Sequence, residues 1–171
     1  MKNHKTTLIG FLLLTTALWA EGTFEMKNAK GETVGTVKIS PASEGVPDVG
    51  VRFDLNLVNL PPGEHAVHIH ATAQCVAPGF DSAGPHFNPE KKSHGEKNPQ
   101  GHHAGDLKNI TVLSDGTAQV TLTATKVSLK AGANSIMGNA GTSLVIHEKA
   151  DDYQSDPAGN AGARIACGVI K

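Results

Sequence analysis

Apolar residues alternate with polar ones most clearly over residues 51–58, which read VRFDLNLV. A period of two is typical of a β-strand with one buried face. Weaker β-rich runs occur near residues 33–39, 64–70, 109–113, 118–124, 143–147 and 164–169, with turn signals such as Pro61-Pro62-Gly63 and Asp115-Gly116 between them. Seven or eight short strands predict an all-β protein, a sandwich or a barrel.

Two long segments, residues 71–105 and 148–163, interrupt this regular spacing, and neither has the apolar stripe of a helix. Long loops in compact domains usually have a function. Each segment begins directly after a histidine at the end of a predicted strand, His70 in one case and His147 in the other. We therefore expect a rigid β scaffold that presents two functional loops.

The first 20 residues differ in composition from the rest of the chain. Lys2 and Lys5 precede an apolar run, and small or uncharged residues follow as far as Ala20. This layout predicts a signal peptide over residues 1–20, with cleavage after Ala17 or Ala20. A membrane anchor is the alternative, but the apolar run is shorter than the ~20 residues that span a bilayer. The expected product is periplasmic or secreted, with no membrane contact after cleavage.

Removal of this segment leaves one predicted domain, residues 21–171, with a formal charge of about −3, because the segment carries two lysines and no acid. A domain with this charge is not expected to bind nucleic acid. The domain contains two cysteines, Cys75 and Cys167. In an oxidising compartment such a pair is most simply interpreted as one disulfide, and two free buried thiols are the alternative.

Histidine is the most informative residue type, since eight of the nine histidines follow the signal segment and most lie on or beside the two long segments. His68 and His70 would project from the same face of a strand, where two imidazoles can bind one ion. Two surface histidines would explain this pair equally well.

A second cluster lies in the first long segment and just beyond it, with His86, His94, the pair His102-His103, and Asp106. Three histidines and one carboxylate within about twenty residues suit a tetrahedral zinc site. Solvated loop histidines are the alternative.

A further histidine, His147, ends an apolar predicted strand. Alone it would more often be a packed or surface residue than a ligand. Together with His68, His70 and His86 it completes a set of four imidazoles, which is the near-planar arrangement that Cu(II) favours.

Several segments together resemble the copper/zinc superoxide dismutase family, in its exported bacterial form. They are His68-Ile69-His70, Gly84-Pro85-His86-Phe87-Asn88-Pro89, His103-Ala104-Gly105-Asp106-Leu107, Ile146-His147-Glu148, and residues 159–169 with the sequence GNAGARIACGV. Order, spacing and flanking residues agree over nearly all of residues 50–171. The resemblance implies an eight-stranded Greek-key β-barrel or sandwich with two long functional loops.

The resemblance also implies the ligands of two metal ions, with one histidine shared between them. The copper ligands would be His68, His70, His86 and His147, and the zinc ligands would be His86, His94, His103 and Asp106. The family's spacing selects His103 over the adjacent His102. Further roles follow by the same matching: Asp151 would accept hydrogen bonds from one ligand of each metal, Arg164 would attract the anion, and Cys75 and Cys167 would form the intrachain disulfide.

The activity that the resemblance implies is dismutation of superoxide, 2 O2⁻ + 2 H⁺ → O2 + H2O2, which protects against oxidative stress outside the cytoplasm. Copper would carry out the redox chemistry, zinc would hold the shared histidine, and His86 would supply a proton. Two other classes compete with this enzyme: a redox-silent protein that stores copper and zinc, and an exported β-sandwich interaction module with incidental histidines. The sequence leaves the oligomeric state open, and a homodimer is one option.

Overall fold

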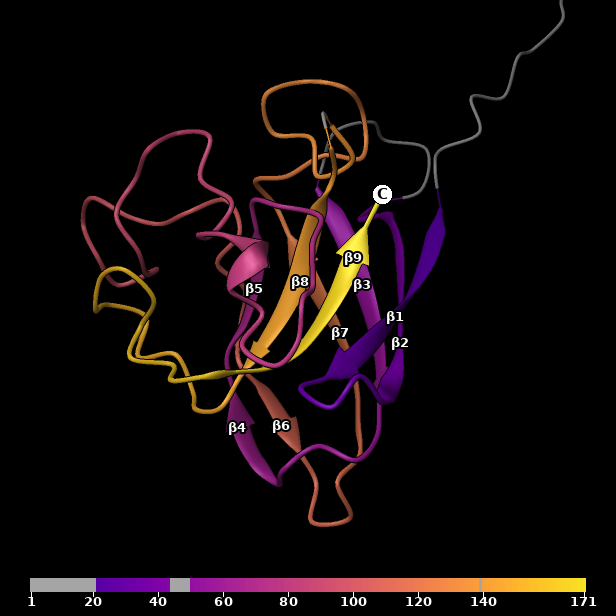
Figure 1. The fold of residues 1–171 in the computed structure, drawn as a ribbon. Helices are drawn as coiled ribbons and strands as arrows, with labels where there is room; N and C mark the ends of the chain where they lie inside the picture. Colours follow the sequence, from indigo (N-terminus) through magenta and orange to yellow (C-terminus); the bar gives the residue numbers. More distant parts are fainter. Residues whose placement is uncertain (1–20, 44–49, 139) are drawn as a thin grey trace, which may run out of the picture.

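The structure is a computed structural model that describes residues 21–43, 50–138 and 140–171, and almost all of its regular structure is β (Figure 1). The strands are β1 (Gly22–Asn28), β2 (Thr33–Pro41), β3 (Val51–Leu57), β4 (Gly63–His65), β5 (Val67–His70), β6 (Ile110–Val112), β7 (Ala118–Ala124), β8 (Thr142–His147) and β9 (Arg164–Ile170). One short 3-10 turn, η1 (Asp81–Ala83), is the one helical element in these ranges. No helix in the described part is long and apolar enough to cross a membrane. The predicted signal segment, residues 1–20, lies outside the described residues.

Seven strands form one curled antiparallel sheet in the order β5-β8-β9-β1-β2-β3-β7, and β4 pairs separately with β6. Neighbours in space are therefore often distant in sequence, as in a Greek key. The two long connections, after β5 and after β8, lie on the same side of the sheet (Figure 1). The predicted all-β barrel or sandwich is confirmed.

The alternating pattern of β3 has the expected cause. Val51, Phe53, Leu55 and Leu57 are at most 1% exposed and belong to one hydrophobic core. The polar residues between them face away from the core, and β3 pairs along its whole length with β2 on one side and β7 on the other. A strand that is paired on both edges and has one buried face shows the clearest period of two.

The predicted strand over residues 64–70 is divided into β4 and β5. At Ala66 the chain changes partner: its N–H donates to the carbonyl of Lys149 (2.8 Å), and its carbonyl accepts from the N–H of His147 (2.9 Å). β4 then pairs with β6, and β5 pairs with β8. If β4 and β5 are counted as one interrupted strand, the described residues contain eight strands, the number that the resemblance implied: the seven runs of the sequence pattern and β1.

The sequence pattern did not indicate β1. Burial alternates along the strand, but its inward face has only two large apolar residues, Phe24 and Met26, of which Met26 alone is fully buried. β1 pairs with β2 along most of its length and with β9 at Lys27 and Asn28.

Candidate metal centre

The first long loop returns to the free edge of β5 and places its own residues beside those of the strand. Isolated antiparallel bridges pair His68 with Asp106 and His70 with His86. The N–H of Ile69 donates to the carbonyl of Gly105 at 2.9 Å. A Cβ on Gly105 would overlap the carbonyl oxygen of Ile69, so this close approach requires glycine. The loop histidines are thus held by backbone contacts to the sheet.

Four buried imidazoles meet at the end of β5 and β8. One nitrogen each of His68, His70, His86 and His147 lies within 4.8 Å of the corresponding nitrogens of the others. The atoms that face inward have no hydrogen-bond partner: Nδ1 of His68 and Nε2 of His70, His86 and His147. Buried polar atoms without a partner are rare, and four in one place suit a shared cation. The donor set of four imidazoles fits copper.

Three of these rings bond an acceptor through their other nitrogen. His70 Nδ1 lies 2.8 Å from the carbonyl of Gly84, and His68 Nε2 lies 2.8 Å from Asp151 Oδ2. A longer contact, 3.4 Å, joins His147 Nδ1 to the carbonyl of Gly162. Because these oxygens only accept, the nitrogen beside each of them carries the hydrogen, and the inward nitrogen keeps its lone pair for a metal.

Next to this group, three histidines converge on one carboxylate. Asp106 Oδ1 lies 2.9 Å from His86 Nδ1 and 3.1 Å from His103 Nδ1, and its Oδ2 lies 3.1 Å from His94 Nδ1. His86 Nδ1 and His103 Nδ1 are 3.3 Å apart. A tetrahedral zinc with bonds of about 2.0 to 2.1 Å separates its ligand atoms by about 3.3 Å. The spacing and the donor types therefore fit zinc.

His86 belongs to both groups. Its Nε2 is one of the four inward nitrogens of the first group, whereas its Nδ1 faces Asp106 in the second. One ligand atom each of His68, His86, His94 and Asp106 also lies within 4.8 Å of those of the other three. His103 joins this second group through its direct contacts with His86 and Asp106.

Burial sets the protonation of the site. It lowers the pKa of His70 to about 2, that of His86 to about 4 and that of His147 to about 3. At neutral pH these rings are therefore neutral, which is the form that binds a metal. Burial alone would raise the pKa of Asp106, but its hydrogen bonds with His103, His86 and His94 lower it well below the ordinary value. The carboxylate is thus ionised.

Asp151, on the second long loop, links the two groups. Its side chain is fully buried, with Oδ2 2.8 Å from His68 Nε2 and Oδ1 3.0 Å from His94 Nε2. Burial lowers the pKa of His94, but hydrogen bonds and charges from Asp106 and Asp151 outweigh it and raise this pKa to about 9. One carboxylate therefore orients one histidine of each group.

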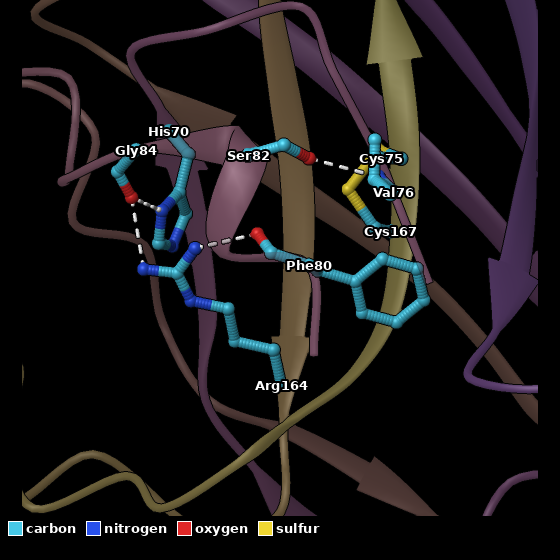
Figure 2. Close-up of a disulfide and its surroundings, with 8 residues drawn as sticks. All are labelled: His70, Cys75, Val76, Phe80, Ser82, Gly84, Arg164 and Cys167. Atoms are coloured by element: carbon cyan, nitrogen blue, oxygen red, sulfur yellow. Dashed lines mark hydrogen bonds between the residues drawn. A yellow bond between two sulfur atoms is a disulfide. The ribbon is translucent and has the colours of Figure 1, made fainter. Parts of the chain in front are cut away.

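Figure 2 shows Arg164 next to His70, one of the four histidines, and the disulfide between Cys75 and Cys167 on the other side of Phe80. The guanidinium donates to the carbonyls of Phe80 (2.7 Å) and Gly84 (2.8 Å), and the Gly84 carbonyl also bonds His70. Cys75 and Cys167 form a disulfide with a Cα–Cα distance of 5.7 Å, which attaches the first long loop to β9. The predicted disulfide is confirmed.

The structure separates the two adjacent histidines that composition alone left ambiguous. His103 is buried against Asp106, whereas His102 is partly exposed and directs Nδ1 to the carbonyl of His103 at 2.8 Å. His65 was not among the predicted site residues. It is 2% exposed, with its ring nitrogens 2.7 Å from the carbonyl of His147 and 2.8 Å from that of Pro61. Its position three residues before His68 was the available signal.

An all-β barrel that brings two adjoining groups of buried metal-ligating side chains together defines a class, the β-barrel metalloproteins. The particular family follows from comparison with known proteins. The family described as copper/zinc superoxide dismutase (SODC) matches residues 33–170. This chain belongs to the copper/zinc superoxide dismutase family.

Relatives and solved structures agree with this assignment. Superoxide dismutase (Cu-Zn) 2 of Aquifex aeolicus is 44% identical over 176 residues, which cover 100% of both chains. The crystal structure of a superoxide dismutase-like protein from Bacillus subtilis has a TM-score of 0.83 and 40% identity, covering 89% of this chain and 100% of that one. The Cu/Zn superoxide dismutase from Brucella abortus has a TM-score of 0.70 and 31% identity, with coverage of 89% and 100%. The predicted family, its oxidoreductase class and its two metals are confirmed.

Proposed function

We propose that this chain dismutates superoxide with copper held by four histidines and zinc held by three histidines and one aspartate. The proposed ligands are His68, His70, His86 and His147 for copper, and His86, His94, His103 and Asp106 for zinc. The observation that carries the proposal is the convergence of four buried, unpartnered imidazole nitrogens on one point. When bound, copper supplies one-electron redox chemistry and zinc supplies charge without redox activity.

Arg164 would attract and orient the anion. A guanidinium has five N–H donors in a fixed plane, and the two bonds to Phe80 and Gly84 leave others for superoxide. The shared Gly84 carbonyl holds the guanidinium at a constant position relative to His70. A held arginine binds an anion with less loss of side-chain entropy than a free one.

His86 would carry a proton for the formation of hydrogen peroxide. Its Nε2 faces the four-histidine group, while its Nδ1 stays 2.9 Å from Asp106. A proton can therefore sit at Nε2 while the other side of the ring keeps its contacts in the zinc group. Asp151 would orient His68 and His94 together, so that the copper ligands and the zinc ligands keep a fixed position relative to each other.

The test is superoxide consumption by the purified protein loaded with both metals. We expect activity in the parent, no activity in His147→Ala, and parental activity in His102→Ala, which changes a histidine outside both groups. Elemental analysis should give near one copper and one zinc per chain for the parent. A parent that binds both metals and consumes no superoxide would indicate a metal store instead, and a parent without metal would indicate an interaction module.

We also propose that residues 1–20 direct export and are removed, which leaves residues 21–171 in the periplasm or outside the cell. The layout of Lys2, Lys5 and the apolar run supports this proposal. Mass spectrometry of the protein recovered from the extracytoplasmic fraction of a bacterial host should give a chain that begins at residue 18 or 21. An intact N-terminus would contradict it. Sedimentation analysis of the same sample would decide between monomer and homodimer.

A further inference from the structure

Asp151 depends on its surroundings for its position, because the second long loop, residues 148–163, has no regular secondary structure. Its carboxylate must still meet His68 Nε2 and His94 Nε2 together, at 2.8 and 3.0 Å. Ligand-orienting groups act only when they are held within about 0.5 Å of the working geometry. Some contact from the rigid barrel must therefore fix the backbone of Asp151.

Asn109, the residue that precedes β6, makes this contact. Its Oδ1 accepts a hydrogen bond from the N–H of Asp151 (2.9 Å), and its Nδ2 donates to the carbonyl of Asp151 (3.0 Å). One planar amide thus binds both backbone polar groups of a single residue 42 positions away. An amide carries a donor and an acceptor side by side, which a carboxylate cannot offer.

The same asparagine is itself held by the loop. Its backbone N–H donates to the hydroxyl of Tyr153 at 2.8 Å, and the N–H of Tyr153 donates to Asp151 Oδ1 at 2.6 Å. Asn109, Asp151 and Tyr153 therefore form a closed ring of hydrogen bonds between the barrel and the loop. Such connected networks restrict motion more than isolated bonds do.

We infer that Asn109 is a positioning residue for the zinc site, which acts by holding Asp151 and, through it, His94. This inference rests on the proposed function, in which His94 binds zinc and Asp151 orients it. Loss of the amide would free the Asp151 backbone and weaken the orientation of His94. Removal of groups that orient metal ligands typically lowers metal affinity 10–100-fold, and we expect about tenfold for Asn109→Ala because it acts one step further out.

The experiment measures zinc affinity of the metal-free, disulfide-bonded full domain by competition with a chromophoric chelator, with no need for superoxide or copper. The variants are Asn109→Ala, Asp151→Asn and the double variant. Asn28→Ala is the matched control, because Asn28 Oδ1 accepts from two backbone N–H groups in the β1–β2 turn, those of Lys30 and Glu32. Urea unfolding of each variant reports loss of stability separately.

We expect Asn109→Ala to bind zinc about tenfold more weakly, while Asn28→Ala keeps the parental affinity. If Asn109 acts through Asp151, the effects are not additive, and the double variant binds zinc about as weakly as Asp151→Asn alone. Parental zinc affinity in Asn109→Ala, or additive effects, would overturn the inference. Should Asn109→Ala fail to fold, Asn109→Asp replaces it, since it keeps an acceptor and removes the donor to the Asp151 carbonyl.

The two proposals fail in distinguishable ways. If Asp151→Asn lowers zinc affinity but Asn109→Ala does not, the inference about Asn109 is wrong and the proposed role of Asp151 stands. If neither variant changes zinc affinity, the proposed role of Asp151 in orienting His94 is also wrong.

Discussion

Alanine at Gly159 would place a methyl group against the carboxylate that links the two histidine groups. A Cβ built there overlaps Asp151 Oδ1 and lies 2.8 Å from His94 Nε2. Gly159 also has φ +64°, a left-handed conformation that costs an L-residue free energy. The variant Gly159→Ala therefore combines a backbone penalty with displacement of a fully buried side chain.

The two contributions can be separated with Gly31→Ala. Gly31 has φ +82°, and a Cβ there has no atom within 4 Å, so this control carries the backbone penalty alone, about 1 kcal/mol. At Gly159 the Asp151 carboxylate must also give up at least one hydrogen bond to a charged group, about 1.5 to 3 kcal/mol. We therefore expect Gly159→Ala to lower the free energy of unfolding of the metal-free protein by about 3 kcal/mol.

Urea unfolding of the metal-free protein measures the loss of stability, and a zinc competition titration measures the loss of zinc affinity. Zinc affinity should fall 10–100-fold in Gly159→Ala and stay parental in Gly31→Ala. Equal losses of stability in the two variants, with equal zinc affinities, would refute the reasoning, since Asp151 would then have moved aside at no cost.

Three further outcomes are expected. His147→Ala should abolish superoxide consumption, and elemental analysis should show that copper is lost while zinc stays bound. Retained copper would count against the four-histidine site. Replacing both Cys75 and Cys167 with serine should lower the free energy of unfolding by roughly 4 to 5 kcal/mol, before any strain in the bridge is subtracted, because the bridge closes a loop with a sequence separation of 92. Unchanged urea unfolding would contradict this. Acid should destabilise the metal-free protein. Burial keeps the pKa of His86 at about 4 and that of His147 at about 3, below the ordinary histidine value of 6.5, so the unfolded chain takes up protons at a higher pH than the folded protein. The free energy of unfolding should then fall as pH drops from about 6.5 to 4, by up to about 1.4 kcal/mol per pH unit for each histidine, and a flat pH profile would exclude this cause.

Much of the fold was predictable because burial on one face leaves a local pattern. β3 shows this best, since each of its core residues alternates with a polar one. The pattern is weak where the buried face of a strand is short, or where the chain changes its pairing partner within a predicted strand. β1 has only two large inward residues, Phe24 and Met26, and was missed. Ala66 interrupts a predicted strand because the chain changes there from pairing with β6 to pairing with β8.

The histidine groups were predictable from residue type and order, but the ring nitrogen that each histidine directs inward was not. The structure shows which ring nitrogens face inward without a partner: Nδ1 of His68, but Nε2 of His70. This difference arises because His68 Nε2 is occupied by Asp151, whereas His70 Nδ1 is occupied by the Gly84 carbonyl. Both acceptors come from loops, whose path has no periodic signal.

The sequence by itself determined the all-β class, the supply of metal-ligating side chains and the pair of cysteines, since these depend on residue type and on the period of local burial. Only the tertiary structure decided that Asn109 holds Asp151, and that the carbonyl of Gly84 bonds both His70 and Arg164. These contacts form when the two long loops fold back on the barrel. Their geometry depends on how segments that are distant in sequence pack together, and no local stretch of the chain determines this packing.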